Sequence, residues 1–407
     1  MDLAKLPYLT DDLPGIGGAT RQRAEDFHVR EEPLVRPAGR GPHAFFLVTK
    51  TGITTQTAVE RLARHMLVPR HAIGFAGLKD AQSVASQWMS LENADPKRLR
   101  AFRNRNLRIE ELTWHSQRLR IGQLRANHFS VRIRGVGRGE LSAAQAVLEA
   151  LSRRGAPNYF GPQRFGLRGD NDALGEALLR GRLDDFLRLY LGSPLEGDEK
   201  EFRAAREAFQ RGDLRGALRR WPRQCTDPRR ALVSYMKRRR AIDAVAAIDV
   251  RLKRLLLSAF QSRIFNQVLA ERIQTIDGLL EGDVVEDRAT GELFPAEPTR
   301  DQGRLERFQI SPTGILPGYD SRLSDGPAGR IERQVLSRGG IELEMFACHR
   351  AIAVKGARRA LRFRLQEPAI AAGRDRHGTF IELRFAAPSG CYATVVLDEI
   401  RKTRTPT

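Results

Sequence analysis

The chain has 407 residues and a mass of 45.8 kDa, which exceeds one ordinary hydrophobic core, so we expect two domains or one domain with a large insertion. Its 69 Lys and Arg outnumber its 49 Asp and Glu by 20, and sixty of the basic residues are Arg. This excess favours a polyanionic partner, because Arg binds phosphates in a bidentate way and stacks on bases. A coding bias towards Arg explains Arg in place of Lys, but not the surplus over acidic residues.

Composition excludes several other classes of protein. A hydrophobic content of 41% with 29% charged residues is typical of a globular chain, not of a disordered or fibrous one. No apolar run approaches the length of a transmembrane helix, and residues 1–5 do not begin a secretion signal. The three cysteines, Cys225, Cys348 and Cys391, are far apart and odd in number, which favours reduced thiols in the cytoplasm.

Recognisable metal and nucleotide motifs are missing from the sequence. It contains no C-x-x-C, H-E-x-x-H or G-x-x-x-x-G-K-[ST] pattern. His65 and His71 lie at the edge of a predicted helix, and we interpret them as surface or core residues, not as metal ligands. We therefore expect no metal and no cofactor, and chemistry carried by ordinary side chains.

The first 154 residues combine strand and helix patterns. Residues 45–48 predict a short buried strand, and residues 129–134 alternate strictly between apolar and polar side chains. A helix is predicted from the i, i+3, i+4, i+7 spacing of Val59, Leu62, Ala63 and Met66. Thr54, Thr55 or Thr57 can cap its N-terminus, and Thr57 to Glu60 also fits a capping box. Ser142 is predicted to cap another helix that runs to Leu151.

From about residue 155 to 348 helical patterns dominate, as in residues 172–180, 201–210 and 252–273, with an Arg-rich stretch at 215–240. The alternating pattern returns at residues 361–365 and 381–385, and residues 393–397 look like a third strand. The economical architecture is an α+β domain built from both ends of the chain, with a helical module inserted. Two consecutive domains with an unrelated tail remain an alternative.

Residues 73–82 stand out because they combine glycines, apolar residues and a terminal charged pair without an amphipathic period. Such a segment indicates a loop that brings its backbone close to a ligand and ends in the carboxylate of Asp80. The alternative is a tight turn in which Asp80 caps a helix beginning at Ala81. Residues 156–166 place aromatics, Gln and Arg between glycines and prolines, which indicates either a platform for RNA or a packed hinge.

Seven segments, in order, closely resemble the TruD family of tRNA pseudouridine synthases. They are residues 25–31 (EDFHVRE), 74–80 (GFAGLKD), 127–129 (NHF), 158–166 (NYFGPQRFG), 258–266 (SAFQSRIFN), 311–318 (SPTG followed by LPG) and 389–394 (SGCYAT). The matches span almost the whole chain, and their shared order makes the resemblance specific.

The resemblance implies a fold and a reaction. The fold is a pseudouridine synthase catalytic domain of α+β class, with a mixed, mostly antiparallel sheet, formed by residues 1–154 and 349–407. A mainly helical insertion, the TRUD domain, then occupies residues 155–348. The implied reaction converts uridine to pseudouridine at position 13 of tRNA, without cofactor or metal, and acts on a base that has left its stack.

The resemblance also implies the site residues. Asp80 is the essential carboxylate, either as a nucleophile or as a base that removes a ribose proton. Phe27, Asn127, Phe129 and Tyr392 occupy the family's substrate-binding positions, although Phe129 could equally be plain core, and Tyr392 stands where the family often has Phe. Arg21 and the adjacent Lys79 are the candidate charge partners that would keep Asp80 ionised.

We expect a cytoplasmic monomer that binds tRNA and no membrane, with basic stretches 98–108, 118–134 and 215–240 contributing to RNA binding. Two alternatives remain open, a synthase acting on other structured RNAs and a non-catalytic tRNA-binding protein. A methyltransferase would need a cofactor-binding glycine loop after a strand, and no convincing one is present.

Overall fold

The computed structural model describes residues 5–347 and 352–403, and these form two compact units. One unit comprises Tyr8–Ala156 and Phe363–Thr403 and is called the sheet unit. The other comprises Pro157–Arg362 with residues 5–7 and is called the helical unit. The predicted boundary at residues 348 and 349 lies outside the described residues.

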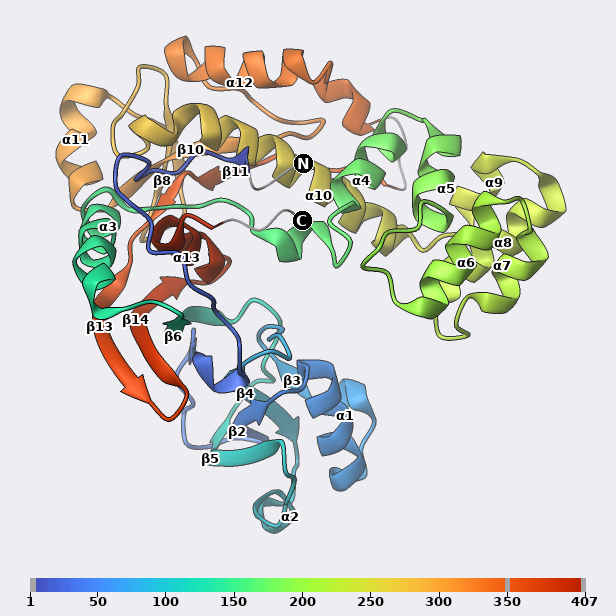
Figure 1. The fold of residues 1–407 in the computed structure, drawn as a ribbon, viewed down its shortest axis with the longest axis horizontal. Helices are drawn as coiled ribbons and strands as arrows, with labels where there is room; N and C mark the ends of the chain where they lie inside the picture. Colours follow the sequence, from blue (N-terminus) through green and yellow to red (C-terminus); the bar gives the residue numbers. More distant parts are fainter. Residues whose placement is uncertain (1–4, 348–351, 404–407) are drawn as a thin grey trace. The chain divides into compact units, whose positions relative to one another are not determined.

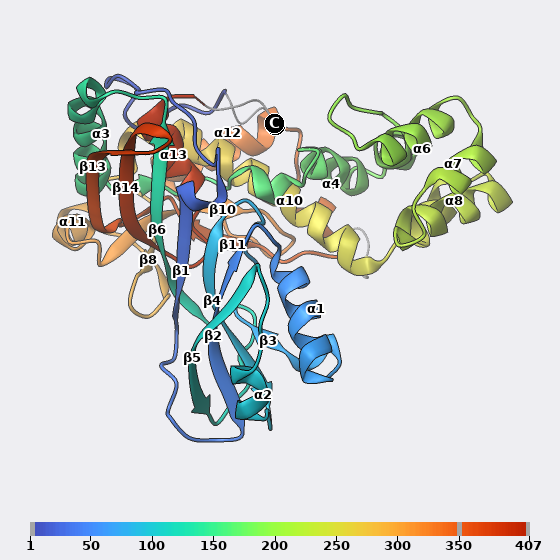
Figure 2. The same cartoon turned by 60° about the horizontal axis from the view of Figure 1, so that its bottom comes forward.

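The sheet unit is built on one eight-stranded sheet with the order β13-β14-β6-β1-β4-β2-β5, and the short β3 pairs with β4 (Figure 2). Only β1 and β4 run parallel, and every other described pair in this sheet is antiparallel. The fold class is thus confirmed as α+β with a mixed, mostly antiparallel sheet. The strands are β1 (Phe27–Pro33), β2 (His43–Thr51), β3 (Gly74–Phe75), β4 (Val84–Glu92), β5 (Leu107–His115), β6 (Leu124–Arg134), β13 (Gln366–Asp375) and β14 (Gly378–Pro388).

Both ends of the chain contribute to this sheet. The late strand β14 pairs with β6 over nine residues, from Phe380 opposite Arg134 to Pro388 opposite Ala126. Alternation explains the pairing, because Val131 and Ile133 of β6 lie opposite Leu383 and Ile381 and all four are buried. The strand that pairs with this side of β6 is therefore distant from it in sequence.

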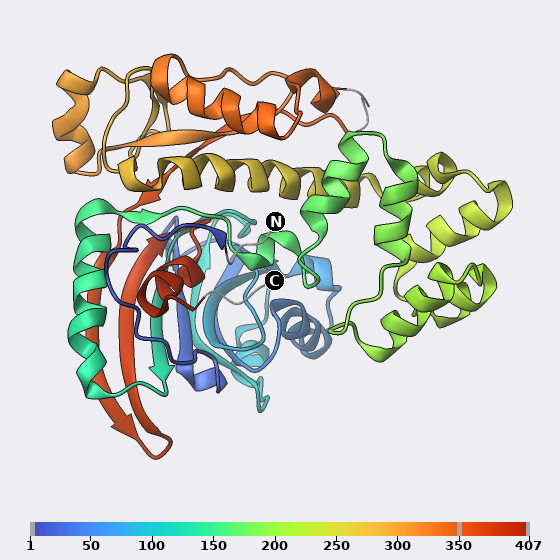
Figure 3. The ribbon, with the colours of Figure 1, turned by 45° about the horizontal axis from the view of Figure 1, so that its top comes forward.

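Four helices accompany the sheet: α1 (Thr55–Met66), α2 (Pro96–Arg100), α3 (Leu141–Arg154) and α13 (Ala393–Arg401). In α1 the apolar residues recur every three or four positions, so that Leu62 and Met66 pack with Phe46 and Met89 of the sheet. Thr54 caps this helix, since its side chain accepts the Thr57 N–H. Figure 3 shows α3 along β13 and β14.

Within the described residues, the helical unit contains the other α-helices and a second, four-stranded sheet with the order β11-β10-β8-β9. Its helices are α4 (Asn171–Leu179), α5 (Leu183–Leu191), α6 (Lys200–Gln210), α7 (Leu214–Arg220), α8 (Thr226–Arg238), α9 (Ala241–Ala246), α10 (Val250–Arg272), α11 (Pro298–Glu306) and α12 (Gly326–Arg338). Its strands are β8 (Val284–Asp287), β9 (Leu293–Pro295), β10 (Ile310–Leu316) and β11 (Ala357–Ala360).

The long helix α10 is the central element of the helical unit, and α12 runs beside it in Figure 3. Helix α4 packs so closely on α10 that a Cβ added at Gly175 would lie 2.1 Å from the Leu256 carbonyl oxygen. Phe260 and Ile264 of α10 belong to a core that extends to Phe186 of α5. Only glycine therefore fits at position 175 without a shift of one helix.

Several local expectations were wrong. Residues 393–397 begin helix α13 instead of a strand, because buried Val396 and Ile400 lie one helical turn apart. Ser142 caps nothing, since α3 begins at Leu141 after Glu140 and has no side-chain cap. Of residues 361–365 only Arg362–Phe363 is a strand. The domain bounds at residues 155 and 348 stay a prediction, and the compact helical unit described above extends to Arg362 and includes β11, which pairs with β10.

Candidate active site

Asp80 lies on a loop of the sheet unit between β3 and β4. Strand β3 pairs with the far end of β4, at Ser90 and Met89, so residues 76–83 must run back along β4 before it begins at Val84. No helix begins at Ala81, and Asp80 therefore does not act as a helix cap. The Asp80 side chain is 43% exposed, which leaves the carboxylate accessible to a ligand.

Buried polar side chains hold the first part of this loop. The Lys79 N–H donates to the Thr55 hydroxyl over 2.8 Å, and that hydroxyl donates to the Gln87 side-chain oxygen, also over 2.8 Å. The Gln87 amide in turn donates to the Gly77 carbonyl over 3.3 Å. Because Thr55 and Gln87 are fully buried on α1 and β4, the loop is tied to two regular elements.

The carbonyl of Asp80 itself is held by a buried ammonium. Lys50 Nζ, from β2, lies 2.6 Å from the Asp80 carbonyl oxygen and 2.6 Å from that of Ile53. The Ser83 hydroxyl donates to the same Asp80 oxygen over 3.0 Å. Burial lowers the pKa of Lys50 to about 8, with repulsion from Lys79 acting in the same direction and attraction to Asp80 opposing it.

Lys79 directs its side chain to Glu31 on β1, with Nζ 2.5 Å from the carboxylate. The other oxygen of Glu31 accepts the Trp88 N–H over 3.1 Å. Burial raises the pKa of Glu31, although its partner Lys79 favours the charged form. The ion pair fastens the residue next to Asp80 to the central strand β1.

Arg21 reaches the Asp80 carboxylate. Its Nη1 lies 3.2 Å from Oδ2 of Asp80, and its guanidinium lies 4.2 Å from the centre of the Phe27 ring. Arg21 adopts a left-handed backbone conformation with φ of 58°, which is uncommon for a residue with a side chain. Of the two candidate charge partners, Arg21 contacts Asp80, whereas the ammonium of Lys79 forms an ion pair with Glu31.

Phe27, Asn127 and Phe129 share one face of the central strands. In the pairing of β1 with β6, Phe129 lies opposite Val29 and Asn127 opposite Glu31. The Phe27 and Phe129 rings meet edge to face with centroids 6.0 Å apart, and Phe129 also contacts Phe385, 5.2 Å away. Phe27 is buried and Phe129 half-buried, so Phe129 is not simply part of the closed core.

Asn127 carries an unsatisfied polar atom. Its side chain is about nine-tenths buried, and its Oδ1 finds no hydrogen-bond partner within the part of the chain that the structure describes. A buried carbonyl without a partner costs about 1–3 kcal/mol. An atom of this kind is available to a donor on a ligand.

Tyr392 lies in the turn between β14 and α13. Its carbonyl accepts the Val395 N–H in the first turn of α13, and its side chain is half-buried. Strand β14 ends with Pro388 opposite Ala126, next to Asn127 in sequence. This places the turn at the end of the sheet from which Asn127 comes.

The sequence analysis assigned no role in the site to four residues that support the Asp80 loop, namely Lys50, Glu31, Thr55 and Gln87. A lysine following the apolar run of residues 45–48 was the available signal for Lys50, because a charge in a buried strand requires partners. Throughout residues 5–347 and 352–403, no group of three or more His, Cys, Asp or Glu is arranged to hold a metal. Nor is any helix in these residues long and apolar enough to span a membrane.

A mixed sheet with a carboxylate on a fixed loop, an arginine partner and an aromatic face defines a candidate enzyme of α+β class. The family model for tRNA pseudouridine synthase D (TruD) matches residues 4–400. The tRNA pseudouridine synthase D of Geobacter metallireducens is 37% identical over 401 residues, covering 98% of each chain. That of Anaeromyxobacter dehalogenans strain 2CP-C is 38% identical over 405 residues, covering 98% of this chain and 97% of the relative.

Among solved structures, a Methanosarcina mazei protein described as a candidate tRNA pseudouridine synthase D (TruD) matches with a TM-score of 0.83 at 25% identity, covering 98% of this chain and 96% of that one. The chain belongs to the tRNA pseudouridine synthase D (TruD) family.

Proposed function

We propose that this protein converts uridine to pseudouridine at position 13 of tRNA, with Asp80 as the essential carboxylate. Family membership supports the isomerase reaction and the tRNA substrate. The observation that carries the assignment to Asp80 is the geometry of its loop. Its carbonyl is held by Lys50, while its accessible carboxylate lies 3.2 Å from Arg21.

The reaction needs no outside reagent. The bond from ribose C1′ to uracil N1 breaks, the base turns, and C5 bonds to C1′. C5 then loses its proton and N1 gains one, so the product is an isomer of the substrate. Asp80 acts either as the nucleophile at the sugar or as the base that removes a ribose proton. In both routes Asp80 reacts as a carboxylate, and the Arg21 guanidinium lies 3.2 Å from it.

The aromatic and amide groups provide a place for the flipped base. We assign Phe27 and Tyr392 to packing against the base or sugar, and Phe129 to the wall of the pocket. The unpartnered Oδ1 of Asn127 accepts a hydrogen bond from a donor on the substrate, which would satisfy this buried atom. We further propose a cytoplasmic monomer that works without cofactor or metal.

The deciding experiment maps pseudouridine in tRNA from cells that lack this protein. Complementation with the wild type should restore pseudouridine at position 13, whereas Asp80→Asn should not. Asp12→Asn, at an exposed carboxylate outside the site, is the matched control and should restore it fully. Persistence of the modification in the deletion strain, or full rescue by Asp80→Asn, would overturn the proposal. If the deletion strain lost pseudouridine from another structured RNA instead, that RNA would replace tRNA as the proposed substrate.

A further inference from the structure

The basic residues of the chain are concentrated in one short segment of the helical unit. Residues 215–240 contain ten Lys and Arg but one acidic residue, Asp227, so this segment carries almost half of the net charge of +20. It includes part of α7 and all of α8. Asp227 is already engaged, because its carboxylate accepts the Asp249 N–H over 2.9 Å. The segment therefore attracts anions strongly.

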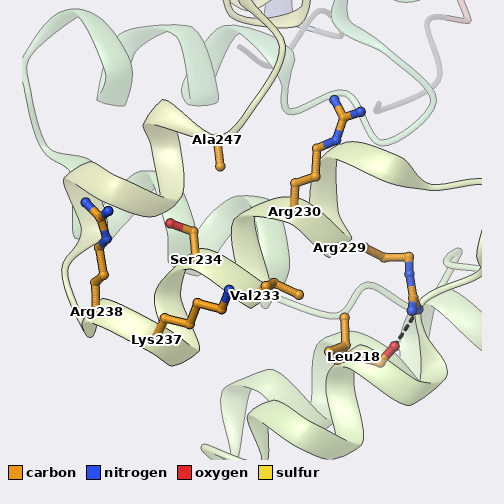
Figure 4. Close-up of a pocket in the computed structure, with 8 residues that line it drawn as sticks. All are labelled: Leu218, Arg229, Arg230, Val233, Ser234, Lys237, Arg238 and Ala247. Carbon is orange, nitrogen blue, oxygen red and sulfur yellow. Dashed lines mark hydrogen bonds between the residues drawn. The ribbon is translucent and has the colours of Figure 1, made fainter.

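A pocket of about 490 Å³ lies against α8 in this segment, and we call it the α8 pocket. Figure 4 shows its basic side chains, Arg229, Arg230, Lys237 and Arg238, around Val233 and Ser234. The pocket is lined entirely by residues of the helical unit, between Leu218 and Ala247.

The four cations of the α8 pocket divide into two kinds. Arg229 donates to the carbonyls of Leu218 and Trp221 over 2.6 and 2.7 Å, and so satisfies two acceptors at the C-terminal end of α7. Arg238 forms an ion pair with Asp243 over 3.0 Å. Arg230 and Lys237 are exposed and have no partner among the described residues. These two are available to a ligand.

Arg230 and Lys237 lie on one face of α8. They are seven residues apart, which is two turns of helix and about 10.5 Å along the axis. A separation of this size suits two different phosphates better than one small anion. Val233 lies between them and is 37% exposed, which offers an apolar contact for a sugar.

We propose that the α8 pocket binds the phosphate backbone of the tRNA substrate through Arg230 and Lys237; this inference rests on the proposed function. Two apolar residues of α8, Ala231 and Leu232, are buried in the core of the helical unit, and Val233 is only 37% exposed. An amphipathic helix that lies on a membrane would present that face outward, so phosphate on RNA is the better match.

The test compares two double variants with the same change in charge. Arg230→Gln with Lys237→Gln removes the proposed contacts, and Arg307→Gln with Arg330→Gln removes two exposed cations elsewhere in the helical unit. Binding of a transcribed tRNA is measured by titration at several salt concentrations. The α8 variant should bind roughly tenfold more weakly, and its salt slope should fall by about 2, one for each lost phosphate contact.

Turnover at saturating tRNA should stay at the wild-type value, because neither residue belongs to the site around Asp80. Equal binding by the two double variants would overturn the inference. A wild-type protein that binds tRNA but forms no pseudouridine would instead contradict the proposed function, so the two failures are distinguishable.

A second inference comes from an independent observation, the contacts of Lys50. This ammonium is fully buried, and one of its two carbonyl partners belongs to Asp80 itself. We infer that Lys50 is a positioning residue, which fixes the main chain of Asp80 so that the carboxylate meets the substrate correctly. Misplacement of a catalytic group by about 1 Å costs on the order of a hundredfold in rate. This inference also rests on the proposed role of Asp80.

Two variants and the pH profile test this role. Lys50→Met keeps the length of the side chain but removes its donors, and kcat should fall on the order of a hundredfold with KM nearly unchanged. In the wild type, Lys50 loses its proton as the pH rises through about 8, and the neutral amine donates more weakly to the two carbonyls, so kcat should decline there. Lys50→Arg stays protonated, and its decline should move to higher pH.

The pH dependence of the free energy of unfolding distinguishes a positioning role of Lys50 from a structural one, because the two roles predict different relations between stability and kcat. The pKa of Lys50 is lowered from 10.5 to about 8 in the folded protein, so the folded state gives up this proton more readily than the unfolded state. This group therefore adds stability as the pH rises from 8 towards 10.5, whereas kcat falls. A kcat that is flat through pH 9 with the same profile in Lys50→Arg, or a folded Lys50→Met with full kcat, would overturn the inference.

Discussion

The Asp80 loop and the α8 pocket use positive charge in opposite ways. Around Asp80 each cation has a fixed partner: Lys50 contacts two carbonyls, Lys79 pairs with Glu31, and Arg21 contacts Asp80. In the α8 pocket, two of the four cations are exposed and have no partner among the described residues. A net charge of +20 therefore combines cations that fix a geometry with cations that attract a polyanion.

Burial decides which role a cation plays. A buried charge is costly unless it is paired, so its partners hold it in one place. An exposed charge keeps its water and its freedom, and contributes little to the free energy of unfolding. Substitutions in the two regions should therefore affect different measurements.

The largest expected effect on stability is at Arg134, a cation of the sheet unit that pairs with two carboxylates. Its side chain is almost fully buried between Asp26, 2.6 Å away, and Asp375, 2.8 Å away. Arg134→Met leaves the buried Asp26 without this partner and should lower the free energy of unfolding by about 3–5 kcal/mol. Urea unfolding of the purified protein measures the change.

The neighbouring Arg132 provides the control for Arg134. It also contacts Asp375, but its side chain is 32% exposed, so Arg132→Met should cost much less. Equal losses for the two variants would mean that burial does not separate the two kinds of cation.

An intermediate effect is expected at Arg21, whose side chain is 22% exposed and contacts Asp80. Arg21→Ala should lower kcat by roughly 10- to 100-fold, which is about 1.4–2.7 kcal/mol, because the carboxylate loses its charge partner. Arg21→Lys should recover part of the loss. Single-turnover kinetics on tRNA measure both, and full activity of Arg21→Ala would remove Arg21 from the site.

The smallest effect on stability is expected in the α8 pocket. Arg230→Gln with Lys237→Gln should change the free energy of unfolding by less than about 0.5 kcal/mol, because both side chains are exposed. Thermal unfolding of this variant beside the wild type checks the value. A loss of more than about 1 kcal/mol would show that these residues support the fold, and would contradict the distinction between cations that fix a geometry and cations that attract a polyanion.

Much of the regular structure was predictable from the sequence, including the Thr54 cap of α1 and the strand over residues 45–48, whereas residues 361–365 and 393–397 were predicted wrongly. The alternation of residues 129–134 and the helical repeat that ends at Met66 correspond to β6 and α1. The strand predicted for residues 393–397 was wrong, because a run of β-branched residues fits a strand or a buried helix equally well, and packing decides between them. The predicted cap at Ser142 was also wrong, because α3 begins after Glu140 and has no side-chain cap.

The candidate site divides in the same way. The motif containing Asp80 was visible in the sequence, as was Arg21 as a candidate partner. The second candidate, Lys79, contacts Glu31, a residue 48 positions away in sequence that no local pattern connects to it. Lys50 escaped notice because its partners are backbone carbonyls, which carry no sequence signature. Contacts to the main chain are therefore the part of a site that sequence reasoning finds last.

The pairing of β6 with β14 bears on how the protein is made. Arg132 and Glu382 meet across this pair although they are 250 residues apart in the chain. At roughly 5–20 residues per second, the ribosome needs on the order of 10–50 s to deliver the second strand after the first. During that interval the whole helical segment 157–362 emerges, while β6 presents an unpaired edge. The Asp80 loop thus belongs to a sheet that is completed only after the whole helical segment has been synthesised.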